Sequence, residues 1–138
     1  MVTVVENRSI LKDANGRQLV IPEQSSGPVI TMTLLDESGV AVPLSAIDTA
    51  TVTIYARDEA GQPIINSVDH VTIKNTGRGT IHATSGLLTL ALVSADNSIQ
   101  ATGNDLEWHR LLIEIGYNGT KALKYEIDAP VRNLNKVS

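Results

Sequence analysis

The sequence predicts an all-β protein, an antiparallel β-sandwich, and three observations carry that prediction. Several short segments alternate apolar and polar residues with a period of two, the pattern of a strand with one buried face. Asn-Gly pairs and Asp-x-x-Gly motifs separate these segments at hairpin positions. No window shows the longer apolar period of an extended helix. The 138 residues match the size of one ordinary domain.

The composition restricts both the core and the partners. The chain has no Phe, one Trp and three Tyr, so Val, Ile and Leu must fill the core. It has no Cys, which excludes disulfides, thiolate metal sites and cysteine nucleophiles. A net charge of −4 without a basic stripe argues against a nucleic-acid partner. The longest uncharged run, residues 79–95, is too short and polar to span a bilayer, and no secretory signal pattern is visible.

The first part of the chain predicts an arm. Residues 2–11 and 17–21 are strand candidates on either side of a segment that ends in Asn15-Gly16, a strong hairpin signal. The following Pro-, Ser- and Gly-containing segment is typical of a loop. We therefore expect residues 1–28 to form an N-terminal β-hairpin arm and residues 29–138 to form the β-sandwich domain.

Hairpins follow from repeated turn motifs. The Asp-x-x-Gly motif occurs three times, with its first Asp at positions 13, 36 and 58. Asp can cap the start of such a turn, and Gly supplies the left-handed residue that ends it. Residues 29–35 and 40–44 flank the second motif. Residues 50–57 precede the third, which returns at residues 63–65, whereas residues 45–49 fit either a helical turn or a loop.

The second half contains further strands. Residues 68–74 and 80–84 are short candidates, and residues 86–93 place Leu88, Leu90 and Leu92 on one face. Residues 94–97 predict a capped helical turn. The final hairpin joins residues 108–117 to residues 121–128 through Asn118-Gly119, and residues 130–138 form a short C-terminal tail.

Catalytic and metal-binding patterns are weak throughout the sequence. No Ser-His-Asp arrangement or zinc spacing is recognisable, so we predict no catalytic, cofactor or metal residue. His109 lies in the inward register of its strand, which favours a core histidine. Two alternatives stay open. One is a loop Ca²⁺ site made by Asp96, Asn97, Asn104 and Asp105; the other is a hydrolase carboxylate pair among Glu107, Glu114, Glu126 and Asp128.

Trp108 is the main candidate for an interaction surface. It occupies the outward face of its strand together with Leu112, and Leu87 adds to that face if the two strands pair. A strand that is apolar on both faces favours burial against a partner. The alternative is a sugar-stacking platform, because indole rings stack on sugars, although such sites usually present several aromatic residues.

Three stretches together resemble a known family. They are residues 52–66 (VTIYARDEAGQPIIN), residues 87–99 (LLTLALVSADNSI) and the closing strand pair at residues 108–131. In their order of strands and turns they resemble the immunoglobulin-like domains of bacteriophage virion proteins, notably the N-terminal domain of baseplate upper proteins. The resemblance covers residues 29–134 and implies an immunoglobulin-like or jelly-roll-like sandwich. It transfers no functional residues, because such domains act through surfaces.

The resemblance also implies a function. The chain is expected to be a non-enzymatic structural protein of a tailed-bacteriophage virion, made in the host cytoplasm and assembled without cofactors. Its partners would be other virion proteins and further copies of itself, in the tail or baseplate or as a decoration protein on the capsid exterior. The alternative is a carbohydrate-binding or host-surface adhesion module that uses Trp108.

Overall fold

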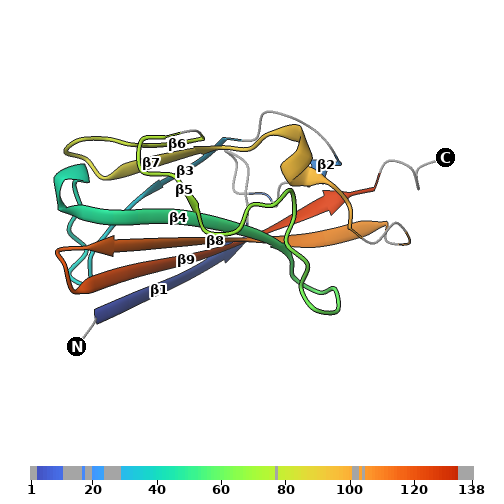
Figure 1. Ribbon diagram of the computed structural model, residues 1–138, viewed down its shortest axis with the longest axis horizontal. Coiled ribbons are helices and arrows are strands. Elements are labelled where there is room, and N and C mark those ends of the chain that lie inside the picture. Colours follow the sequence, from blue (N-terminus) through green and yellow to red (C-terminus); the bar gives the residue numbers. More distant parts are fainter. Residues whose placement is uncertain are drawn as a thin grey trace.

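Two β-sheets make up the described part of the chain (Figure 1). The computed structural model describes residues 17, 20–23, 29–76, 78–100, 103 and 105–133, and the backbone of residues 3–10. The only helical elements among these residues are two short 3₁₀ turns, η1 (Leu44–Ala46) and η2 (Ser94–Asn97). None of the described residues belongs to a helix long and apolar enough to cross a membrane. The prediction of an all-β protein is confirmed.

The large sheet is built on three long antiparallel strands, β4 (Ile47–Ala56), β8 (Leu106–Tyr117) and β9 (Lys121–Arg132). The short β5 (Val71–Thr72) pairs with the free side of β4. On the other side, β1 (Thr3–Ile10) and β2 (Ile21–Pro22) both pair with β9, which places β9 inside the sheet. This sheet curls into a half-barrel.

The small sheet has the order β3-β7-β6 and is antiparallel. Its strands are β3 (Val29–Thr33), β6 (Gly79–Ile81) and β7 (Leu87–Ala91). Figure 1 shows it lying over the large sheet, with η2 on the path from β7 towards β8. The strands predicted at residues 29–35, 50–57, 86–93, 108–117 and 121–128 are all present.

The N-terminal hairpin prediction is wrong in its pairing. β1 and β2 both run parallel to β9, with Ile10 opposite Asp128 and Ile21 opposite Val131, so the large sheet is mixed and not purely antiparallel. One edge of β9 pairs with β8, and its other edge would expose a long row of unpaired backbone groups. β1 and β2 pair with that edge instead of with each other. The Asn15-Gly16 signal and Leu134 of the expected tail lie outside the described residues.

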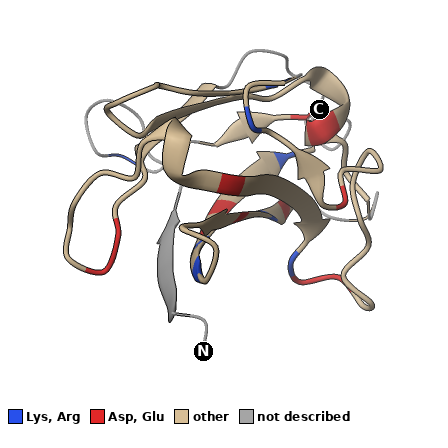
Figure 2. Ribbon diagram, turned by 60° about the vertical axis from the view of Figure 1, so that its left-hand side comes forward, with Lys and Arg blue, Asp and Glu red and all other residues tan. Residues whose placement is uncertain are grey.

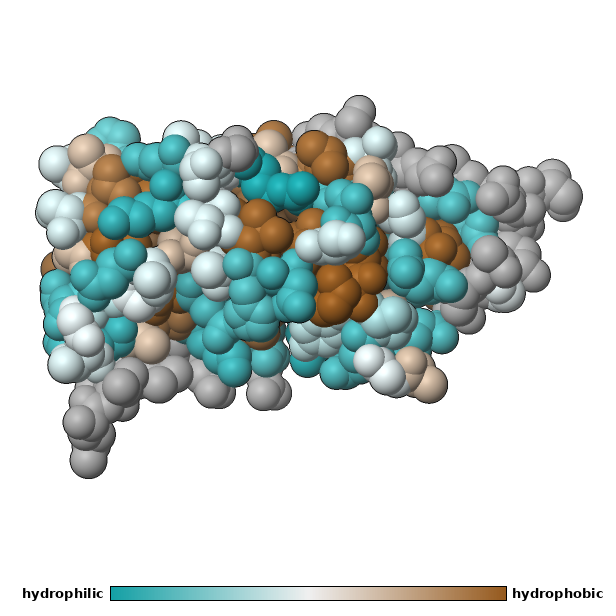
Figure 3. Space-filling view, in the orientation of Figure 1, coloured by the Kyte–Doolittle hydropathy of each residue, from teal (hydrophilic) through white to brown (hydrophobic). Residues whose placement is uncertain are grey.

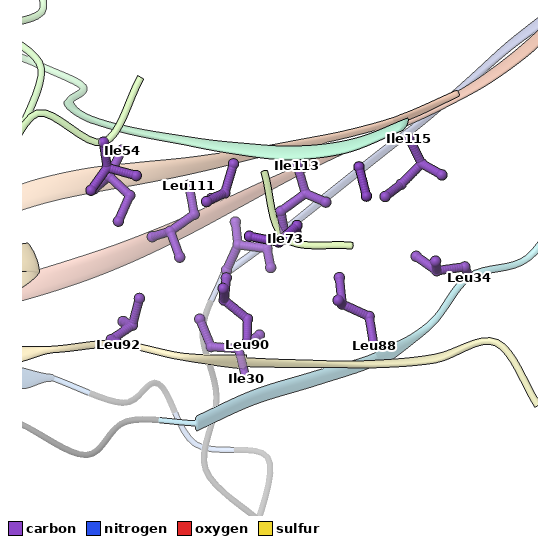
Figure 4. Close-up of a cluster of buried hydrophobic side chains, with 14 of the residues drawn as sticks. Ile30, Leu34, Ile54, Ile73, Leu88, Leu90, Leu92, Leu111, Ile113 and Ile115 are labelled. Carbon is purple, nitrogen blue, oxygen red and sulfur yellow. The ribbon is translucent and has the colours of Figure 1, made fainter. Parts of the chain in front are cut away.

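The core lies between the two sheets and contains mainly aliphatic side chains, as predicted (Figure 4). Leu88 and Leu90 of β7 point towards Leu111 and Ile113 of β8 and are fully buried. Along β8 the inward register holds Glu107, His109, Leu111, Ile113, Ile115 and Tyr117, all of which are buried. The strict alternation confirms the predicted faces of this strand.

Two turns confirm the motif analysis. The Oδ1 atom of Asp36 accepts hydrogen bonds from the amides of Ser38 (2.8 Å) and Val40 (2.9 Å), and Gly39 has a φ of +78°. Asn118 and Gly119 have φ values of 50° and 74° and close the β8–β9 hairpin, a conformation that Asn and Gly tolerate best. These local devices set the register of the strands that they connect.

Glu37 in the first of these turns fastens the two sheets together at one end. Its carboxylate accepts hydrogen bonds from the Tyr117 hydroxyl (2.9 Å) and from Lys121 Nζ (2.8 Å) at the β8–β9 hairpin. The Lys121 ammonium is the largest cause that lowers the pKa of Glu37 to about 2. Burial, followed by the bond to Glu37, raises the pKa of Tyr117 to about 12. The carboxylate therefore stays ionised over the ordinary pH range.

Candidate interaction surfaces

The outer face of the large sheet carries a connected set of charges. Arg57 follows β4 and donates to Asp128 of β9 (Nη1 to Oδ2, 3.0 Å). Arg110 of β8 donates to the same carboxylate (Nε to Oδ1, 2.7 Å) and lies 3.6 Å from Glu126 Oε2. Burial raises the pKa of Asp128, but the bonds from Arg110 and Arg57 outweigh it and hold that pKa below its usual value. We call this set, together with Trp108, the charged face.

Trp108 is half-buried within the charged face. The guanidinium carbon of Arg57 lies 4.7 Å from the centroid of its indole ring, a cation–π contact. The next residue across the sheet, on β9, is Pro130. One ring face is therefore occupied by Arg57, and a sugar could stack there only after displacing a guanidinium that Asp58 and Asp128 also hold.

The three predicted surface residues do not form one surface. Trp108 and Leu112 share the outward face of β8, as predicted, and Leu112 lies in a row with Thr53 and Glu126. Leu87 belongs to β7 of the small sheet, and its side chain points away from the core. The hydrophobic core therefore separates Leu87 from Trp108 and Leu112. The alternation of residues along this segment predicts that Leu87 points outward, but it does not predict the sheet to which the strand belongs.

The outer face of the small sheet contrasts with the charged face. Its strands carry no charged residue, and they are uniformly tan in Figure 2. We call this surface the neutral face. It consists of Val29, Thr31 and Thr33 of β3, Leu87, Thr89 and Ala91 of β7, and Thr80 of β6.

Large apolar side chains are exposed on and beside the neutral face. Val29 is 57% exposed and Leu87 41%. Leu35 and Val93 continue the same alternation beyond β3 and β7, and they too are exposed. These four make up half of the eight exposed large hydrophobic residues in the part of the chain that the structure describes. The side view of Figure 3 looks along the edges of the sheets, and there too apolar side chains reach the surface among hydrophilic ones.

A buried polar cluster closes one end of the core. The Asp96 side chain in η2 is fully buried and accepts hydrogen bonds from Asn66 Nδ2 (3.0 Å) and the Val93 amide (2.8 Å). Arg78 Nη1 makes a short ion pair with the same carboxylate. Asp96 thus connects three segments that are distant in sequence, and its carboxylate oxygens already have partners.

The described residues of the proposed Ca²⁺ site do not form a common binding site. Asp96 and Asn97 are buried, Asp105 is exposed, and Asn104 lies outside the described residues. Among the described residues, no group of three His, Asp or Glu side chains could hold a metal ion. The helical turn predicted at residues 94–97 is present as η2, and the Asp96 carboxylate caps it by accepting from the Val93 amide.

Glu107 and His109 form a buried pair beside this cluster. His109 Nε2 lies 2.6 Å from Glu107 Oε1, and the Gln100 amide donates to both oxygens of Glu107 (2.9 and 3.1 Å). Each side chain is 2% exposed. His109 Nδ1 has no hydrogen-bond partner among the described residues, although the Asp96 backbone is near enough to favour its protonated form.

This pair places His109 in the core, as predicted. Of the four carboxylates in the hydrolase alternative, Glu107 is buried on the inner face, whereas Glu114, Glu126 and Asp128 belong to the outer face of the large sheet. The four therefore do not converge on one site.

Acidification is expected to destabilise the protein through His109. Burial lowers the pKa of His109 from 6.5, and the bond with Glu107 offsets this only in part. The unfolded chain then binds the proton more readily, so the free energy of unfolding falls as the pH drops below about 6.5. Urea unfolding between about pH 8 and pH 5 should show a smaller loss in His109→Gln than in the native protein. Equal losses in the two proteins would contradict the assignment.

A shallow groove of about 490 Å³ lies on the outer face of the large sheet near the β8–β9 hairpin. Its floor includes Gly116 and Ala122, whose small size leaves the space open. His70 borders it in a left-handed conformation (φ +52°), with its ring 2.6 Å from Asp69 and 3.3 Å from Glu114. The open shape of the groove defines no particular ligand.

Comparison with known proteins adds no further guide to these surfaces. No family model matches the sequence, and neither a curated protein nor a solved structure does. The assignment of function depends on the geometry of the surfaces and on the stretches that carry the resemblance.

Proposed function

We propose that the protein is a non-enzymatic structural component of a tailed-bacteriophage virion that assembles through protein–protein contacts. Its place would be the tail or baseplate, or the capsid exterior as a decoration protein. In this proposal the two sheets are the halves of an immunoglobulin-like or jelly-roll-like sandwich. The order of strands and turns in residues 52–66, 87–99 and 108–131 supports it.

The observation that carries the proposal is the position of β1. It is the outermost strand of the large sheet, and all eight of its residues pair with β9 on one side. Its other edge pairs with no strand among the described residues. Such an edge presents a row of backbone donors and acceptors to which another chain can add a strand. Monomeric proteins usually shorten or cover an edge of this length.

The charged face supports the non-enzymatic part of this proposal. Its arginines and carboxylates are directed at one another, because Asp128 binds both Arg57 and Arg110. Groups engaged in this way contribute to the rigidity of the sheet and are not poised for a substrate. The contact between Arg57 and Trp108 also disfavours the carbohydrate-binding alternative, because it occupies one face of the indole ring.

The presence of the chain in virions can be measured directly. Mass spectrometry of gradient-purified tailed particles, produced by the genome that encodes the chain, should detect its peptides in an amount comparable to other structural proteins. Their absence from intact particles would overturn the proposal.

The role of β1 has its own test, the deletion of residues 1–10. We choose this boundary because Ile21 is 2% exposed, and a longer deletion would remove part of the core. The truncated protein should be excluded from particles, whereas the control Ala60→Ser in an exposed turn should be incorporated normally. Circular dichroism would confirm that the truncated protein is folded. A folded truncated protein that is incorporated like the control would show that β1 has no part in assembly.

A further inference from the structure

We propose that two copies of this chain pair through the outer edge of β1, with the two β1 strands antiparallel about a two-fold axis at Asn7. The large sheets of the two copies would then continue into one another. This inference rests on the proposed function and names the partner that the edge of β1 takes, a second copy. The geometry of identical strand edges and the order of charged residues along β1 and β9 both point to that partner.

The outer edge of β1 lies at one side of the molecule. β1 is the last strand of the large sheet in that direction, and among the described residues only β9 pairs with it. Figure 1 shows β1 along the lower rim of the molecule, away from β6 and β7 of the small sheet. A further strand at this edge would therefore extend the large sheet away from β6 and β7.

Two copies of one edge can pair in only a few registers. Successive residues of a strand direct their backbone N–H and C=O groups to alternate sides. Two identical antiparallel edges therefore form hydrogen bonds only where even-numbered residues stand opposite even-numbered ones. The two-fold axis then passes through one residue and not between two residues. Two such registers pair all but one of the eight residues of β1, one with the axis at Glu6 and one with the axis at Asn7.

The charged residues of β1 select between these two registers. With the axis at Glu6, this residue would stand opposite Glu6 of the second copy, and like charges at directly opposed positions are destabilising. With the axis at Asn7, the opposed pairs are Glu6 with Arg8, Val4 with Ile10, and Val5 with Ser9. The charged pair joins opposite signs, and no pair joins like charges. The sequence of β1 is thus complementary in charge to itself about Asn7, as a two-fold interface requires.

The neighbouring strand β9 extends this charge pattern across the sheet. In the parallel pairing of β1 with β9, Glu6 stands opposite Lys124. Two positions further along, Arg8 stands opposite Glu126. In the proposed pair these rows join end to end, so the sign of the charge alternates across the β9 and β1 strands of both copies. Each copy has a net charge of −4 and repels the other at long range, and the alternation supplies local attraction at the contact.

The extent of the contact predicts a weak pair in solution. An antiparallel pairing of this length makes about six to eight backbone hydrogen bonds between the copies. These bonds replace bonds to water, so each contributes little net free energy. Isolated chains are therefore expected to pair only at high concentration. In a particle that holds many copies close together, the effective concentration is high enough for a weak contact to be occupied.

Cysteine cross-linking tests the register, because the chain has no cysteine of its own. Asn7→Cys places two cysteines opposite one another at the axis, with Cα atoms about 5 Å apart. The matched control is Ser9→Cys on the same strand, whose two copies would stand about 13 Å apart, too far for a disulfide. Under mild oxidation at high protein concentration, Asn7→Cys should form disulfide-linked dimers at least about ten-fold faster than Ser9→Cys. Equal rates for the two variants would overturn the proposal.

A mixture controls for the reactivity of the cysteine at position 9. Ser9 stands opposite Val5 of the second copy in the proposed register. An equal mixture of Ser9→Cys and Val5→Cys should therefore form mixed disulfide-linked dimers nearly as fast as Asn7→Cys alone forms its dimer. A mixture as slow as Ser9→Cys alone would overturn the register.

Charge reversal provides a second measurement that does not depend on thiol chemistry. Glu6→Arg sets arginine against arginine in the proposed pair, and Arg8→Glu sets glutamate against glutamate. In sedimentation experiments each variant alone should associate at least about ten-fold more weakly than the native chain. An equal mixture should recover association, because every reversed charge then stands opposite an unlike charge. A mixture that associates no better than the single variants would overturn the register.

The pairing and the proposed function fail in different experiments. A native chain that stays monomeric at millimolar concentration would overturn the pairing, and its detection in purified virions would show that the proposed function survives. A chain that cross-links through Asn7→Cys as predicted but is absent from virions would overturn the proposed function and leave the pairing in place.

Discussion

Replacing Asp96 with alanine is expected to lower the free energy of unfolding by about 3 kcal/mol. The Asp96 side chain is fully buried and binds Arg78, Asn66 and the Val93 amide. Its removal leaves a guanidinium that is only 18% exposed without its carboxylate, together with two donors that have lost their acceptor. We choose the lower end of the range for buried ion pairs because part of Arg78 reaches solvent.

Urea unfolding of three variants separates the ion pair from general damage to the fold. Asp96→Ala should show the full loss, and the double variant Asp96→Ala with Arg78→Met should recover part of it because the unpaired charge is gone. The control Asp105→Ala changes an exposed carboxylate and should stay within about 0.5 kcal/mol of the native protein. A loss of less than about 1 kcal/mol in Asp96→Ala would show that the cluster is not a structural anchor.

Leu90→Ala is expected to cost about 3–4 kcal/mol. Leu90 lies on the central strand of the small sheet, is 0% exposed and points into the core towards the large sheet (Figure 4). The loss combines the transfer free energy of the removed atoms with the cost of the cavity that they leave. A core between two sheets in a chain without Phe has few large side chains that could move in to fill that cavity.

The adjacent residue provides a matched control for this prediction. Thr89→Ala removes atoms from the neutral face of the same strand and should change the free energy of unfolding of the monomer by no more than about 0.5 kcal/mol. Thermal and urea unfolding at low protein concentration would measure both variants. Similar losses at the two positions would mean that both faces of β7 are buried in the isolated chain, which would contradict the exposure of the neutral face.

Local structure could be predicted from the sequence where neighbouring segments pair. The β8–β9 hairpin is the clearest example, because Asn118-Gly119 and the alternation on both strands specify the same register. The inward faces of β7 and β8 were predicted for the same reason. In each case the signal is contained within one strand or one turn.

Long-range pairing could not be predicted in this way. β1 pairs in parallel with β9, more than one hundred residues away, and a local pattern does not say which edge a strand will cover. Leu87 was expected near Trp108 if their strands paired, but β7 and β8 belong to different sheets. The requirement for glycine at position 86 is also set by a distant segment and could not be predicted from the local sequence. Its φ is +68°, and a Cβ there would lie 2.7 Å from the Val42 carbonyl oxygen, a constraint set by a distant segment.

The candidate surfaces were predicted only in part. The outward direction of Trp108 and Leu112 followed from alternation, but the stacking of Arg57 on Trp108 depends on the register between β4 and β8. The neutral face was missed because its threonines are ordinary strand residues when taken one at a time. Its signal is the absence of charge across three strands, which becomes visible only when those strands are placed side by side.

Side-chain footprinting with hydroxyl radicals tests the central claim, that this protein acts by assembly through its surfaces. Oxidation of each residue would be compared between the isolated chain at low concentration and intact particles. We predict strong protection of Val29, Leu87 and Val93 in the particle, whereas Val71 in β5 of the large sheet serves as the internal reference. Equal oxidation of Val29, Leu87 and Val93 in both samples would contradict it.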